Sequence, residues 1–160
     1  MTVCDEWKDV DVFIGWYAEH HIEGWDVEKD LIPLYEGRSE KQYSPDNCCF
    51  VPKALNQWFA LTSSTPKLEM NSVGCYIKVR NRINKFTKPN VRLTSNNEQG
   101  LLEQWYLYKD LHFEKRVWEM KEEHKKLCEK YPNTPQISPK LLSVLENFST
   151  EEYLKKKSSE

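Results

Sequence analysis

The sequence predicts an α+β fold in which a small strand, loop, strand and helix unit precedes a short antiparallel three-stranded sheet packed on a long helix. Three observations lead to this prediction. Residues 24–59 place a turn-rich segment between two short apolar runs and end in a helix start. Residues 73–94 read as a meander of short strands, and residues 76–83 alternate apolar and polar positions, as strands with one solvated face do. Residues 98–131 have apolar side chains at helical spacing.

Length and composition are typical of a folded chain. The 160 residues are 39% hydrophobic and include only 5 glycines, which fits one ordinary domain or two small ones. We expect a first unit at residues 1–60, a linker at 61–72, a second unit at 73–148 and a polar, frayed tail at 149–160. No apolar run approaches the length of a membrane span and no signal peptide opens the chain, so we expect no membrane partner and a cytoplasmic location.

The first element is expected to be a short amphipathic helix within residues 5–21. Asp9 or Asp11 is the candidate N-cap. The His20-His21 pair near its end has two interpretations. It either ends the helix, where a histidine suits the negative helix terminus, or supplies a catalytic base at His21 and a ligand at His20. The apolar positions of this helix are Trp7, Val10, Phe13, Ile14 and Tyr17.

The segment from residue 24 to 59 is expected to form a small metal site. Glu28, Lys29 and Asp30 sit on an apolar-polar alternation that reads as a strand, with Trp25, Val27, Leu31 and Ile32 as its apolar positions. Residues 33–46 form a long loop. Asn47 enters the next apolar run, and Asn56 lies in the first turns of a helix over residues 53–60. The side chains of two Asn residues at this spacing can face the same space between the elements. Polar groups then gather where strand, loop and helix meet, as they do in a small metal site.

The motif YSPDNCCFVP, preceded by GWDVEKD and followed by Asn56, resembles the homing-type HNH endonucleases encoded by bacteriophages. The resemblance covers roughly residues 3–59. It implies a ββα-metal fold that grips one divalent ion, and for a phage-encoded protein it implies the host-cell cytoplasm. By position, Glu28 stands where that family has an Asp ligand, Lys29 at the base position, Asn47 as the loop-bracing Asn and Asn56 as the helix ligand.

Charge is divided unevenly along the chain. Residues 1–48 contain 4 Lys or Arg against 12 Asp or Glu, whereas residues 49–95 contain 8 against 1. A basic face is the usual electrostatic signature of phosphate binding, so the middle third predicts contact with double-stranded DNA. The acidic first third offers a surface for a host protein.

The alternation in residues 76–83 places three basic side chains on one predicted strand face. The alternative is a solvated outer face. The expected strands are residues 75–82, 83–86 and 91–94, and with the following helix they weakly resemble the AP2 DNA-binding domain that often follows the HNH part. The expected nucleic-acid contacts are Lys78, Arg80, Arg82, Lys85, Lys88 and Arg92.

The rest of the chain is expected to be helical. Asn96 or Asn97 caps a helix from Glu98 to Tyr131, either continuous or broken near residue 110, and Ser138-Pro139 opens a last helix at residues 140–148. We expect neither histidine of the long helix, His112 nor His124, to be catalytic. Five cysteines without a CxxC pair favour buried free thiols over disulfides or a zinc site.

Two functions are compatible with these patterns. The first is a DNA endonuclease that hydrolyses phosphodiester bonds with one Mg²⁺ or Mn²⁺, for which the oxygen ligands Glu28 and Asn56 are suited. The second is a catalytically inactive, nuclease-derived protein that binds DNA or a host protein. A basic, aromatic-bearing sheet also leaves RNA open as a target.

Overall fold

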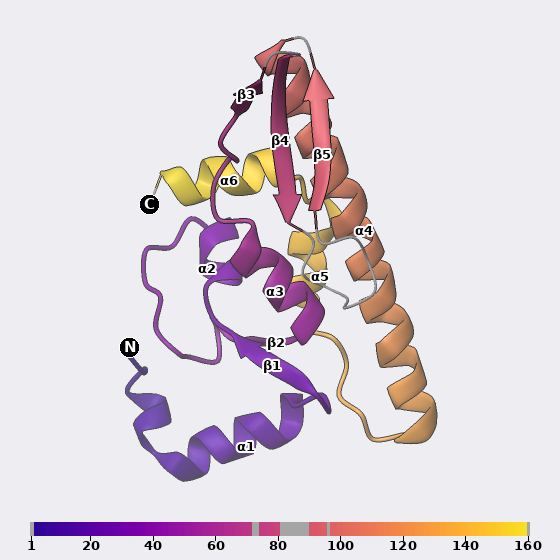
Figure 1. Cartoon of the computed structure of the whole chain (residues 1–160). Coiled ribbons are helices and arrows are strands. Elements are labelled where there is room, and N and C mark those ends of the chain that lie inside the picture. Colours follow the sequence, from indigo (N-terminus) through magenta and orange to yellow (C-terminus); the bar gives the residue numbers. More distant parts are fainter. Residues whose placement is uncertain (1, 72–73, 81–89, 96, 160) are drawn as a thin grey trace.

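The computed structural model describes residues 2–71, 74–80, 90–95 and 97–159 (Figure 1). It mixes helices with two small antiparallel sheets, which confirms the α+β class. The elements are η1 (Glu6–Lys8), α1 (Val10–His20), β1 (Trp25–Glu28), α2 (Leu31–Tyr35), β2 (Cys49–Pro52), α3 (Lys53–Leu61), β3 (Glu69–Asn71), β4 (Gly74–Arg80), β5 (Asn90–Ser95), α4 (Glu98–Lys130), α5 (Pro139–Glu146) and α6 (Thr150–Ser158).

The predicted N-terminal helix is present as η1 followed by α1. The Asp9 side chain accepts a hydrogen bond from the Asp11 backbone N–H at 3.0 Å, so Asp9 is the N-cap. α1 ends at His20, and His21 is its C-cap residue. The histidine pair therefore lies at the end of a helix and not on a strand.

β1 and β2 form a two-stranded antiparallel sheet, and α3 follows β2 without a loop. In the register Trp25 pairs with Pro52 and Glu28 pairs with Cys49. α3 contacts both strands, and its Leu55, Trp58 and Phe59 are buried. β1, β2 and α3 therefore follow one another in the order expected for residues 24–60, but a helix, α2, lies between the two strands.

α2 interrupts the long loop expected between the two strands. The sequence analysis extends the first strand toward Leu31 and starts the loop at Pro33, and both expectations are wrong. The Glu28 carboxylate accepts hydrogen bonds from the Asp30 and Leu31 N–H groups, which stabilises a helical turn there. Pro33 fits this turn because an N–H near a helix start has no partner within the helix.

The second sheet has the order β3, β4, β5. β3 lies within the expected linker, so residues 69–71 are strand and not linker. β5 covers the predicted strand at residues 91–94, and β4 covers most of the one at 75–82. The predicted strand at residues 83–86 lies outside the described residues.

α4 is continuous through Asp110 and has the expected cap. The Asn97 side chain accepts a hydrogen bond from the Gly100 N–H at 2.5 Å. α5 begins at Pro139 after the Ser138 cap, as the Ser-Pro pair predicts. These caps fix both helix starts in the positions that the sequence indicates.

The expected polar tail is a helix, α6, with Tyr153 and Leu154 buried. Ser149 and Glu152 have the S-x-x-E spacing of a capping box, and the Ser149 side chain accepts a hydrogen bond from the Glu152 N–H. Ion pairs from Glu151 to Lys155 and from Glu152 to Lys156 support the exposed face. The expectation of a frayed tail is wrong because these local signals act together with burial.

α6 is tied to α4 by one carboxylate. Asp110 Oδ1 accepts hydrogen bonds from the Thr150 N–H at 2.8 Å and from its hydroxyl at 2.6 Å. Thr150 is fully buried.

One hydrophobic cluster contains residues from both sides of residues 61–72, including Val51, Leu101 and Leu141. This packing places α6 against α4 and α2.

Within the described ranges, no helix has the length and apolar character needed to cross a membrane.

Candidate functional site

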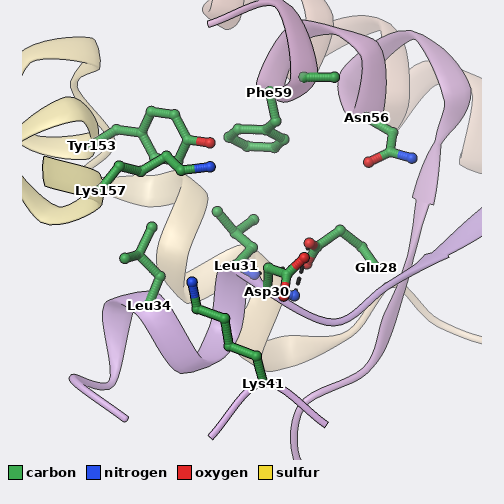
Figure 2. A pocket seen from close by; sticks show the side chains of 10 residues that line it. Glu28, Asp30, Leu31, Leu34, Lys41, Asn56, Phe59, Tyr153 and Lys157 are labelled. Carbon is green, nitrogen blue, oxygen red and sulfur yellow. Dashed lines mark hydrogen bonds between the residues drawn. The ribbon is translucent and has the colours of Figure 1, made fainter. Parts of the chain in front are cut away.

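A cavity of about 400 Å³ lies where the end of β1, α2, α3 and α6 meet. Figure 2 shows Glu28 and Asn56 on one side of it and Tyr153 and Lys157 on the other. The lining combines carboxylates, a carboxamide and lysines with an apolar floor. The lining residues are Glu28, Asp30, Leu31, Leu34, Lys41, Asn56, Phe59, Ala60, Tyr153 and Lys157.

Glu28 is the last residue of β1, and its carboxylate is held by backbone. Oε1 accepts from the Asp30 N–H at 2.8 Å and Oε2 from the Leu31 N–H at 2.9 Å. Burial raises the pKa of this carboxyl, and the charge of Asp30 adds to the rise, while the two backbone N–H groups and Lys29 oppose it. Each oxygen retains lone-pair capacity for a further partner.

Asn56 reaches the cavity because α3 starts directly after β2. Glu28 ends β1 opposite the first residue of β2, and α3 folds back over both strands. Leu55, Trp58 and Phe59 occupy the buried face of α3, which leaves Asn56 at the edge of that face, half-buried. The structure therefore brings together the two residues expected to be metal ligands.

Lys29 does not line the cavity. Its ammonium lies 2.6 Å from Asp30 Oδ1 and 5.5 Å from the centre of the Tyr43 ring. The hydrogen bond to Asp30 is the main cause that raises the pKa of Lys29. A lysine with a raised pKa stays protonated at neutral pH, so it cannot accept a proton from water.

Asn47 is buried and braces the loop that leads into β2. Its Nδ2 donates to the Gln42 carbonyl at 2.8 Å and to the Glu40 carbonyl at 3.3 Å. Its Oδ1 accepts from the Arg38 guanidinium at 2.5 Å. These are contacts of a loop-bracing carboxamide, and they leave Asn47 outside the cavity lining.

The two adjacent histidines lie at a different place. His20 stacks on Trp16, and its Nδ1 donates to the Trp16 carbonyl at 2.7 Å. His21 stacks on Tyr17 and meets the Phe50 ring edge-on. Neither is among the residues that line the Glu28 cavity, so the structure does not bring His21 together with Glu28 and Asn56.

Three of the expected nucleic-acid contacts lie on described strands. Lys78 of β4 is the register partner of Arg92 of β5, and Arg80 pairs with Asn90. The other three, Arg82, Lys85 and Lys88, lie outside the described residues. The backbone thus places Lys78 and Arg92 beside each other in one sheet.

Comparison with protein-family models, with curated proteins and with solved structures finds no match.

The donor groups of the cavity fit a hard divalent cation. Glu28, Asp30 and Asn56 line one cavity and present carboxylate and carboxamide oxygens, which are the donor groups that could hold such an ion. Mg²⁺ is often held by one or two carboxylates and keeps several waters. None of the described ion pairs involves Glu28, so a bound cation would stabilise the ionised form of this buried carboxylate.

Sequence reasoning missed Lys41 and Lys157 in this lining. Lys157 comes from α6, and its ammonium lies 5.7 Å from the centre of the Tyr153 ring. No local motif links it to residues 28–56, because the contact depends on the tertiary tie between Asp110 and Thr150. Asp30, in contrast, belongs to the quoted GWDVEKD motif.

His124 and Cys128 form a second group that the sequence analysis did not pair, although their i, i+4 spacing indicates it. His124 Nε2 lies 2.8 Å from the Pro135 carbonyl, and the Cys128 sulfur lies 3.8 and 3.6 Å from Nδ1 and Nε2. A sulfur almost equidistant from both nitrogens does not point at either one. The contact between His124 and the Pro135 carbonyl thus ties α4 to the following connection.

Cys48 and Cys49 are buried free thiols, as expected.

Proposed function

We propose that this chain is a divalent-metal-dependent DNA endonuclease of the HNH type, which hydrolyses phosphodiester bonds. One observation carries the proposal. Glu28 from β1 and Asn56 from α3 line the same cavity, in the strand, strand and helix order that a ββα-metal nuclease uses. The presence of Asp30 and two lysines in the same lining supports it.

Glu28 and Asn56, with Asp30 beside them, would hold one Mg²⁺ or Mn²⁺. The bound ion would neutralise charge on the scissile phosphate and on the leaving oxygen. Lys41 and Lys157 stand on other walls of the cavity, where ammonium groups can contact phosphate oxygens. The cavity therefore has a cation side and a phosphate side.

Proton transfer in this proposal proceeds without an imidazole. The described lining residues include no histidine, and Lys29 is held protonated by Asp30. Water bound beside Glu28 and Asn56 would lose its proton to solvent, with the positive charge of the site lowering its pKa. Replacing both histidines is therefore expected to leave cleavage intact.

DNA would be held mainly by the second sheet. Lys78 and Arg92 are adjacent in its register, and the segment from residue 49 to 95 has eight basic residues against one acidic residue. Phosphate contacts of this kind position a duplex and depend strongly on salt. In the same proposal, β3, β4, β5 and α4 together act as a DNA-binding unit similar to the AP2 domain.

Nicking of supercoiled plasmid with Mg²⁺ or Mn²⁺ tests the proposal. We expect cleavage by the wild-type chain and a loss of about a hundredfold or more in Glu28→Gln and Asn56→Ala. Gln57→Ala changes the exposed neighbour on α3 and serves as the matched control. The His20→Ala/His21→Ala double variant separates cleavage without imidazole from cleavage that needs it. Cleavage that survives in Glu28→Gln would contradict the assigned site.

The second candidate is a nuclease-derived protein that binds DNA without cleaving it. The observation in its favour is the Lys29 to Asp30 ion pair, which removes the residue at the base position from catalysis. Wild-type protein that binds duplex DNA in a salt-dependent manner but fails to nick it with either metal would select this candidate.

A further inference from the structure

α1 presents an apolar stripe to solvent. Val10, Ile14 and Tyr17 are spaced i, i+4 and i+7, so they lie on one face of the helix. Their side chains remain 64%, 55% and 37% exposed. Scattered exposed apolar residues are common, but three in register on one helix form a continuous strip of the kind that packs against another helix.

The opposite side of α1 is held by aromatic rings, and Trp16 packs against the hydrophobic core. Tyr17 lies at the edge of the exposed stripe, where its ring also meets Phe50 at 5.4 Å. Phe13 and Trp16 contact the buried Trp7 ring at centroid distances of 5.1 and 4.7 Å, and Trp16 stacks on Phe50 at 5.6 Å. None of the 11 residues of α1 is buried. Isolated helices of this length are marginal in water, so α1 has stabilisation to gain from a partner on its free face.

The surface around this stripe is strongly acidic. Lys8 is the only lysine or arginine among residues 5–23, and it is already paired with Asp5 at 2.5 Å. Figure 1 shows α1 at one edge of the molecule, beyond the β1 and β2 strands and away from α6. The carboxylates of this segment, all on exposed residues, are Asp5, Glu6, Asp9, Asp11, Glu19 and Glu23.

This charge decides which class of partner fits. Phosphates of nucleic acid and anionic lipid headgroups would be repelled by six carboxylates that one lysine does not offset. A protein segment with lysines or arginines beside its own apolar residues would be attracted to them and would cover the stripe.

We propose that the exposed face of α1 is a docking surface for a basic amphipathic helix of a partner protein. The partner would place Leu, Ile or Met at i, i+3, i+4 and i+7 against Val10, Ile14 and Tyr17, and basic residues on both flanks of that row. This surface is separate from the Glu28 cavity, whose lining contains no residue of α1. Docking and catalysis are therefore independent properties.

The test uses the full-length chain and a fluorescent 18-residue peptide built only of Leu and Lys in a helical amphipathic pattern. A peptide of the same pattern with Glu in place of Lys is the charge control. Binding is measured by fluorescence anisotropy at 50 and 500 mM NaCl. Ile14→Ser removes the centre of the stripe, and Leu111→Ser, at an apolar position 57% exposed on α4, is the matched control.

We expect micromolar binding of the Lys peptide, at least tenfold weaker binding at high salt, and at least tenfold weaker binding by Ile14→Ser but not by Leu111→Ser. The proposal is overturned if the Glu peptide binds as well, if both serine variants bind alike, or if no binding is seen at 100 µM peptide. It is also overturned if light scattering shows a dimer that Ile14→Ser dissociates, because a second copy would then occupy the face.

Discussion

α1 and α3 are helices of similar length, 11 and 9 residues, that are held in opposite ways. α3 buries Leu55, Trp58 and Phe59, whereas α1 buries none of its residues. Burial fixes α3 against the β1 and β2 strands, and so gives Asn56 a defined place beside Glu28. α1 is attached through ring contacts on one side and leaves the other free. The helix with buried residues holds a cavity side chain in a defined place, and the helix without them leaves an apolar stripe exposed.

The strongest test of this contrast is Trp58→Ala. Trp58 is 2% exposed and meets Phe113 and Phe148 at centroid distances of 4.9 and 5.5 Å. Removing such a ring leaves a cavity, so we expect a loss of about 3–5 kcal/mol in the free energy of unfolding, measured with urea. Trp118→Ala, at a position 64% exposed on α4, should change it by less than about 0.5 kcal/mol. Similar losses in both variants would refute the assigned burial.

Asn47→Ala should have the next largest effect. The carboxamide is buried. Its loss would remove the donor to the Gln42 carbonyl and one acceptor of the Arg38 guanidinium, which keeps its bonds to Glu36 and Asp46. At about 1 kcal/mol for each hydrogen bond we expect about 2–3 kcal/mol of destabilisation. Gln42→Ala, which leaves the backbone carbonyl of that residue in place, is the control. A loss below about 0.5 kcal/mol would mean that the loop does not depend on Asn47.

Several elements were predictable because their signals are local. Asp9, Asn97 and Ser138 cap helices where the sequence indicates. The α6 helix was missed although Ser149 and Glu152 form a readable capping box, since a polar composition outweighed it in the prediction. α2 was missed for a different reason. Its start depends on the Glu28 carboxylate, which the sequence analysis assigned to metal binding alone.

The candidate site was predictable only in part. The resemblance of YSPDNCCFVP and its flanks pointed to Glu28 and Asn56, and the structure brings them to one cavity. Lys157 follows Asn56 by about a hundred residues and reaches the cavity through the contact between Asp110 and Thr150. No spacing rule predicts such a contact, because it depends on how α4 and α6 pack.

Glu28 should make stability depend on pH. Burial raises the pKa of its carboxyl above the ordinary value of 4.5, so the folded state binds this proton more tightly than the unfolded state. Its contribution is then fully present below pH 4.5 and is lost as pH rises through the folded-state pKa. Glu28→Gln should flatten this part of the unfolding profile, measured by thermal denaturation from pH 4 to 8.

The response of the melting temperature to a divalent metal ion tests the same carboxylate, Glu28. A cation bound to ionised Glu28 should raise the melting temperature at pH 7 in the wild-type chain but not in Glu28→Gln. Glu23→Gln, on the exposed turn before β1, should keep both the pH profile and the metal response of the wild type. An unchanged pH profile in Glu28→Gln would show that the carboxylate is well solvated, and the cavity would then be more open than the structure indicates.

The smallest expected effect is that of Ile14→Ser on the isolated chain. Ile14 is 55% exposed on the free face of α1, so little apolar area returns to water on substitution. We expect the free energy of unfolding to change by less than about 0.5 kcal/mol, measured by urea denaturation with Phe13→Ala as the comparison on the contacting face. Phe13 meets the Trp7 ring, and its loss should cost more. A larger cost for Ile14→Ser would mean that this face is already covered in solution, and the contrast between α1 and α3 would disappear.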